Sequence, residues 1–128
     1  MEKSYEVAAN WWAKRIKNFK RFDNGESDKN NFLASLLATQ NALNSMPSEE
    51  QLLTFEKALA KLIKDELKSK DEVIAKVDYD PNELLLNAAK EAGISKTVFP
   101  WKTIVWVKDN KVTVRDGYNA KVEIIYQK

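Results

Sequence analysis

Apolar residues recur every three or four positions over the first half of the chain, which is the spacing of one face of an α-helix. This spacing predicts helices at about Tyr5–Phe22, Asp28–Asn44 and Ser48–Lys68. Ser4 is the expected N-cap of the first helix, because a serine hydroxyl satisfies an amide that the first turn leaves unpaired. The segment Ser48-Glu49-Glu50-Gln51 has the form of a capping box and marks the start of the third helix.

The apolar period changes to two at Val73–Tyr79, which predicts a β-strand. The segment Asp80-Pro81-Asn82-Glu83 then has the composition of a helix start, with Asp80 as the N-cap, proline at the first helical position and glutamate three residues after the cap. This fourth helix ends at Gly93, where Ile94 is placed for the apolar contact of a Schellman cap.

Three segments after Pro100 have the composition of short strands. They lie at Lys102–Lys108, Lys111–Arg115 and Lys121–Tyr126. Asp109-Asn110 predicts a two-residue hairpin turn between the first two, because both residues tolerate a positive φ. The segment Lys102–Lys108 is apolar on both faces, which indicates a central strand.

These elements predict a single α+β domain over residues 1–128. The expected architecture is an N-terminal three-helix segment followed by β-α-β-β-β, with the helices packed on one face of a small, mostly antiparallel sheet. The first strand, the fourth helix and the second strand form either a parallel crossover unit or an antiparallel pair, and the sequence favours neither.

The composition excludes several kinds of chemistry. The 128 residues include no cysteine and no histidine, which removes thiol nucleophiles, disulfides, zinc-thiolate sites and the commonest general base. The chain has 3 glycines, at positions 25, 93 and 117, so a glycine-rich phosphate loop is also excluded. Asp78, Asp80 and Glu83 do not make a metal site, because the last two are used in the predicted helix cap. We expect no enzyme activity, no cofactor and no metal.

Charge is unevenly distributed about a net value of +2. Residues 1–22 and 93–128 are basic, whereas residues 23–56 are acidic. Lysine far outnumbers arginine, which weakens the case for a protein that reads DNA sequence. No apolar run is long enough to span a membrane, and the first five residues have no apolar signal region, so we expect a soluble, cytoplasmic protein.

Two segments combine aromatic and basic side chains. Trp11 lies at the edge of the apolar face of the first helix, and such a tryptophan beside cations is typical of a protein-interface anchor or a base-stacking platform. The second segment is Phe99-Pro100-Trp101-Lys102-Thr103. A purely structural role in the core stays open for both segments. The candidate partner-binding residues are Trp11, Lys14, Arg15, Lys17, Trp101 and Lys102.

Basic residues of the two segments form one positive groove if the first helix and the sheet share a face. The residues of this expected groove are Lys14, Arg15, Lys17, Lys102, Lys108, Lys111 and Arg115. Such a groove favours nucleic acid as a partner, whereas a discrete aromatic anchor favours a protein.

Five segments of the chain carry a resemblance to known proteins: Ala8–Ala13, Phe22–Gly25, Val77–Pro81, Ala92–Ile94 and Phe99–Thr103. They resemble small accessory proteins carried by phages and mobile elements of low-GC Gram-positive bacteria. The resemblance implies a setting in which small proteins bind and block a host protein, including CRISPR effectors and other defence complexes, and it assigns no role to any residue. The expected function is therefore a non-enzymatic inhibitor or adaptor that blocks a host protein or nucleoprotein complex, for example an anti-CRISPR protein. The alternative is a nucleic-acid-binding accessory protein.

Overall fold

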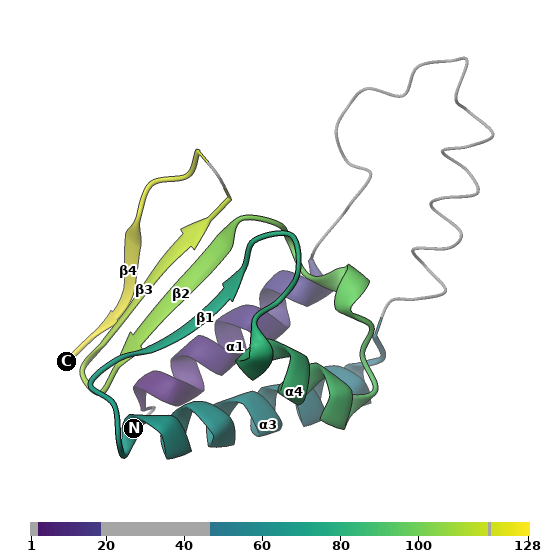
Figure 1. Ribbon diagram of the computed structural model, residues 1–128, viewed down its shortest axis with the longest axis horizontal. Helices are drawn as coiled ribbons and strands as arrows, with labels where there is room; N and C mark the ends of the chain where they lie inside the picture. The colour runs from purple at the N-terminus through teal and green to yellow at the C-terminus, as the bar shows by residue number, and fades with distance from the viewer. Residues whose placement is uncertain (1–2, 19–46, 118) are drawn as a thin grey trace.

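Three α-helices cover one face of a four-stranded antiparallel sheet in the part of the chain that the structure describes (Figure 1). The computed structural model describes residues 3–18, 47–117 and 119–128. The helices are α1 (Ser4–Lys17), α3 (Glu49–Leu67) and α4 (Glu83–Ala92), and a short 3-10 helix, η2, covers Lys96–Val98. The strands are β1 (Val73–Val77), β2 (Thr103–Lys108), β3 (Lys111–Asp116) and β4 (Glu123–Gln127).

The order of the elements differs from the predicted order. Along the described residues it is α-α-β-α-β-β-β, so the expected N-terminal three-helix segment followed by β-α-β-β-β is wrong, although the α+β class is confirmed. The helix predicted at Asp28–Asn44 lies outside the described residues. α1 packs directly against α3, which packs against α4, and these helices form the layer over the sheet (Figure 1). Apolar periodicity measures only whether a segment is amphipathic, and it does not assign that segment a place in such a layer.

Local side-chain contacts fix where α1 and α3 begin. At α3 the Gln51 amide donates to Ser48 Oγ (3.1 Å) and the Ser48 amide donates to Gln51 Oε1 (2.9 Å), so the predicted capping box is confirmed. At α1 the N-cap is Lys3 and not Ser4, because the Lys3 amide donates to Glu6 Oε1 (3.0 Å) and Ser4 is buried as the first helical residue. α1 also ends earlier than predicted.

The predicted start of the fourth helix is corrected as well. α4 is capped by Asn82 and not by Asp80, and the Asn82 side-chain oxygen accepts from the Leu85 amide (3.3 Å). The Asn82 side-chain nitrogen also donates to the Ile74 carbonyl of β1 (2.8 Å). Pro81 is buried, forms an isolated β-bridge with Val77 at the end of β1, and does not begin the helix. Contacts with β1 therefore decide which of two possible capping residues is used.

The end of α4 agrees with the prediction. Gly93 adopts the left-handed conformation with φ 71°. The Ile94 amide donates to the Ala89 carbonyl (2.8 Å) and the Gly93 amide donates to the Lys90 carbonyl (3.2 Å), which is the bonding pattern of a Schellman cap. Ile94 is buried, so its apolar contact is also present.

The sheet follows the order β1-β2-β3-β4, and every neighbouring pair is antiparallel. This resolves the open question about β1 and β2 in favour of the antiparallel pair. β2 lies inside the sheet, as predicted. Lys108 pairs with Lys111 across Asp109-Asn110, so the two-residue hairpin is confirmed, but neither turn residue has the expected positive φ.

The core lies between the helix layer and one face of the sheet. Trp12 of α1, Phe55 of α3 and Phe99 before β2 are all buried, and the Phe99 ring lies 6.0 Å from the Trp12 ring and 5.8 Å from the Phe55 ring. Alternate residues of the strands, including Val105 and Val114, complete this core. Burial of these large side chains supplies the main driving force for folding.

Candidate functional site: the outer face of the sheet

The second face of the sheet, which we call the outer face, carries none of the helices that the structure describes (Figure 1). Side chains alternate between the two faces along a strand. Val105 and Val107 are buried under the helices, so Ile104 and Trp106 of the same strand point to the outer face, where they are half-buried. The strand that is apolar on both faces therefore presents one of those faces at the surface.

A row of side chains crosses the outer face from edge to edge. Ile74 pairs with Trp106, Trp106 with Thr113, and Thr113 with Ile124. Ile74 and Ile124 at the two ends are 40% and 49% exposed, and the two residues between them are half-buried. Directly opposed side chains of antiparallel strands contact one another. The row is therefore a continuous surface with a tryptophan near its centre.

The charges on the outer face have a single sign. None of the outward-pointing positions in the four described strands is Asp or Glu. The outward-pointing cations are Lys76, Lys108, Lys111 and Arg115. The apolar row thus lies in a positive field, which complements an acidic surface or a phosphate backbone.

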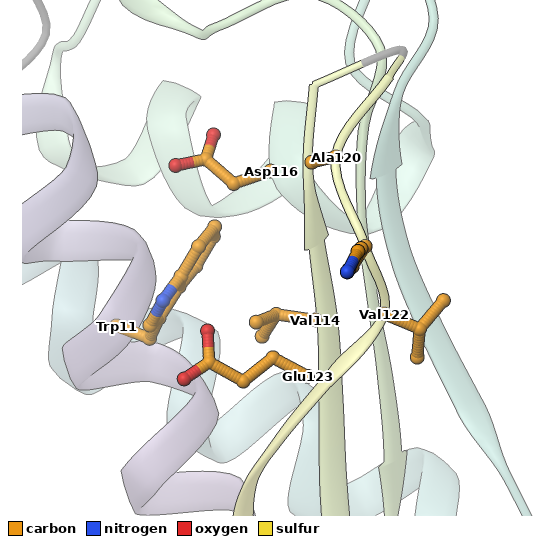
Figure 2. A pocket seen from close by; sticks show the side chains of 7 residues that line it. Trp11, Val114, Asp116, Ala120, Val122 and Glu123 are labelled. Atoms are coloured by element: carbon orange, nitrogen blue, oxygen red, sulfur yellow. The ribbon is translucent and has the colours of Figure 1, made fainter.

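Of the predicted site residues, Trp11 and Arg15 lie where α1 meets β3 and β4. Trp11 is half-buried and lines a cavity of about 430 Å³ together with Val114, Asp116 and Glu123 (Figure 2). Arg15 Nε contacts both carboxylate oxygens of Asp116, at 2.8 and 2.9 Å. Arg15 therefore anchors the last turns of α1 to the end of β3.

Lys14 and Lys17 lie elsewhere on α1. Both line a shallow hollow of about 220 Å³ between α1 and α3, together with Glu49 and Leu53 of α3. Lys17 Nζ lies 4.0 Å from Glu49 Oε1, and both side chains are largely exposed. At 100° per residue, Lys17 is turned about 120° from Trp11 around the helix axis. Lys17 therefore lies on a different side of α1 from Trp11.

Trp101 and Lys102 belong to a third surface, which we call the aromatic corner and define as Asp78, Tyr79, Trp101 and Lys102. The Tyr79 and Trp101 rings meet edge to face at 5.8 Å and are 64% and 57% exposed. Lys102 Nζ pairs with the Asp78 carboxylate and lies 4.5 Å from the centre of the Tyr79 ring. The Lys102 amide donates to the Asp78 carbonyl (2.9 Å), which joins the two segments.

The expected positive groove is wrong, because its members lie on opposite sides of the sheet. α1, which carries Lys14 and Arg15, packs on the covered face. Lys111 and Arg115 point to the outer face. The six predicted residues therefore fall into the three settings described above.

Sequence reasoning missed Trp106 and Ile74 as candidate binding residues. Trp106 was assigned to a strand that is apolar on both faces, and such strands are usually covered on both sides. Tyr79 was likewise assigned to the end of the first strand, whereas β1 ends at Val77 and Tyr79 is exposed. No pattern in the sequence indicated which face of this strand the described helices would cover.

Neither a metal-ligand cluster nor a membrane-spanning helix occurs in the described residues. Among them, no group of three or more His, Cys, Asp or Glu side chains is placed to hold a metal ion. None of the helices in the described part of the chain is both long enough and apolar enough to cross a membrane.

Comparison with known proteins identifies a fold and no family. No family model and no curated protein matches the sequence. Among solved structures, the chain is similar to the BTG/Tob domain of C. elegans FOG-3, with a TM-score of 0.61 and 13% sequence identity. The match covers 98% of this chain and 89% of that chain. At this identity the similarity shows that the two chains share a fold.

Proposed function

We propose that this chain is a non-enzymatic protein-binding domain and that its outer face binds an acidic surface of a partner protein. The observation that carries the proposal is the row from Ile74 through Trp106 to Ile124, which crosses the sheet without a covering helix in the described residues. A contiguous exposed apolar surface with a polar rim is typical of a protein interface.

The composition of the outer face supports a protein partner. A tryptophan that is already half-buried by its neighbours loses little side-chain freedom on binding, and tryptophan is among the commonest residues that dominate binding energy. The lysines around the row, of which Lys76 is exposed, add attraction for an acidic surface and exclude basic ones. The absence of cysteine and histidine from the sequence favours binding over catalysis, because the commonest nucleophile and general base are missing.

Pull-down from host lysate, with each captured protein quantified, tests this proposal. Trp106→Ala should reduce capture of a specific partner at least tenfold, which is the effect of losing a central interface tryptophan. The matched control is Leu53→Ala, since Leu53 is 52% exposed on α3 and lies on the helix side of the molecule. Equal capture by the wild type and the Trp106 variant would contradict the proposal.

A second pair of variants keeps the test independent of folding. Lys76→Glu reverses a charge on the outer face, whereas Lys57→Glu reverses an exposed charge on α3. Both are surface changes with small expected effects on stability. If the partner presents an acidic surface, Lys76→Glu weakens capture and Lys57→Glu does not.

The alternative function is nucleic-acid binding through the same face. The specific observation in its favour is that Trp106 lies among cations, an arrangement that also suits base stacking with phosphate contacts. Fluorescence anisotropy with single- and double-stranded DNA and RNA at about 50 and 200 mM salt separates the two functions, since phosphate contacts give a log–log salt slope of about −0.7 to −0.9 each. Salt-sensitive binding that is lost in Trp106→Ala would favour nucleic acid.

The more specific role, a phage or mobile-element inhibitor or adaptor such as an anti-CRISPR protein, stays a prediction that rests on the sequence resemblance. The cytoplasmic location of the protein is likewise a prediction. Identification of a host defence protein among the specifically captured partners is the result that would support the inhibitor role.

A further inference from the structure

The two edge strands of the sheet, β1 and β4, differ in whether their unpaired backbone edge makes hydrogen bonds. At β1, Asn82 closes the edge: its side chain donates to the Ile74 carbonyl (2.8 Å) and its amide donates to the Lys76 carbonyl (2.9 Å). At β4, no strand in the described part of the chain pairs with the outer edge. An uncovered edge strand offers a row of backbone donors and acceptors to another extended segment.

A cavity of about 430 Å³ lies beside the open edge, between β4 and α1. Figure 2 shows the Trp11 ring on the helix side, with Val114, Asp116 and Glu123 facing it from the sheet, while Val122 points away. The size is in the range of pockets that hold ligands. A segment that pairs with β4 would therefore place alternate side chains over this cavity.

The carboxylates that line the cavity favour a ligand with a cationic side chain. Asp116 is already paired with Arg15. Glu123 is exposed, and no hydrogen bond or ion pair within the described residues uses its carboxylate. Lys121 also lines the cavity, but it is exposed and its long side chain can hold its charge in water. The Glu123 carboxylate, which remains for a ligand, lines the same cavity as the Trp11 ring (Figure 2).

We propose that the open edge of β4 and the Trp11–Glu123 cavity form a second binding site, which takes an extended peptide segment of a partner protein and accepts one arginine side chain of that segment. The peptide backbone pairs with β4, as in other cases of strand addition. The guanidinium stacks on Trp11 and donates to the Glu123 carboxylate. Arginine is preferred to lysine because its planar group does both at once.

The site does not depend on the outer face. Glu123 pairs with Val114 and points to the helix side, whereas the neighbouring Ile124 pairs with Thr113 and points to the outer face. The extra residue that shifts the register of β4 lies on the C-terminal side of these two pairs, between them and the pairing of Val112 with Tyr126. The part of β4 beside the cavity is therefore regular in its pairing.

Titration of ¹⁵N-labelled full-length protein with a designed peptide tests the proposal. The peptide has nine residues, is rich in threonine, and carries one arginine at its centre. Backbone amide shifts are expected to concentrate in Glu123–Gln127, together with a shift of the Trp11 indole N–H. Replacing the arginine by glutamine should weaken binding at least about threefold, the effect of one exposed charged contact. N-methylation of alternate peptide nitrogens should abolish binding, because it removes the backbone donors.

Exchanging the charges of Glu123 and of the peptide distinguishes a direct effect on binding from an effect on folding. Glu123→Gln should weaken the arginine peptide about two- to fivefold, and Glu123→Lys should restore binding to a peptide that carries glutamate in place of arginine. A change in folding would not produce that reversal. Leu53→Ala, on the exposed side of α3, is the control and leaves peptide binding unchanged. The experiment measures peptide binding at β4, so failure of the outer-face proposal would not affect this result.

Three results would overturn the proposal. The first is no shift at β4 with the arginine peptide at millimolar concentration. The second is equal binding of the arginine and glutamine peptides. The third is that the protein without peptide has twice the monomer mass, and that its β4 amide signals move on dilution as the dimer dissociates. This result would assign the open edge to a second copy of this chain.

Discussion

Asn82→Ala is expected to be one of the most destabilising polar-to-alanine substitutions in the described part of the chain. Two contacts are lost: the Asn82 oxygen accepts from the Leu85 amide at 3.3 Å, and its nitrogen donates to the Ile74 carbonyl at 2.8 Å. Loss of an N-cap costs about 1 kcal/mol and loss of a hydrogen bond to a strand carbonyl costs about 1 kcal/mol more. We therefore expect unfolding free energy to fall by about 2 kcal/mol, equivalent to about 6–10 °C in Tm.

Two further variants separate these contributions in urea denaturation followed by circular dichroism. Asn82→Asp keeps an acceptor for the cap and loses only the donor to β1, so it should cost about 1 kcal/mol. Asp80→Ala is the matched control, because sequence patterning assigned the cap to Asp80, whereas the structure gives it an exposed ion pair with Lys96 at 3.4 Å. Such a pair is worth less than about 0.5 kcal/mol. A larger loss for Asp80→Ala than for Asn82→Ala would refute the reasoning.

Four other substitutions test the contacts that hold the fold. Gly93→Ala should cost about 1 kcal/mol in thermal unfolding, because φ is 71° and the nearest atom to an added Cβ, Nε2 of Gln51, lies at an ordinary 3.5 Å; an unchanged Tm would contradict this. Ser48→Ala should lose about 1 kcal/mol in urea denaturation, because the capping box is broken; a loss below the measurement error would count against the cap. Phe99→Ala should cost about 3–5 kcal/mol and Trp101→Ala less than about 1 kcal/mol, because Phe99 is 1% exposed and Trp101 is 57% exposed; guanidinium denaturation of both variants measures the difference, and the reverse order would be inconsistent with the described core.

Features that depend on a few neighbouring residues could be predicted from the sequence. The capping box at Ser48 and the Schellman cap at Gly93 are examples, since each is closed by bonds within about one helical turn. The hairpin at Asp109-Asn110 was located for the same reason, although its expected backbone conformation was wrong.

Features that depend on contacts distant in sequence could not be predicted in this way. Local patterning favours Asp80 as the cap, because Pro81 and Glu83 follow it at the expected spacing. The bond from Asn82 to β1 nevertheless selects Asn82. The candidate site illustrates the same limit. The alternation of Ile104 and Trp106 with buried valines shows that β2 has two apolar faces, but only the arrangement of the helices reveals that the described helices cover just one of them.

The positions of the two proposed binding sites follow from which face and which edge of the sheet are covered in the described structure. The helix layer covers the inner face of the sheet, and Asn82 closes the edge at β1. The outer face and the β4 edge are the parts of the described sheet that this arrangement leaves open. They meet at β4, where Ile124 lies on the outer face and the adjacent Glu123 faces the cavity beside Trp11. A segment added to β4 would extend the outer face by one strand, so a single partner can use both sites, and the affinity of each would then contribute to one complex.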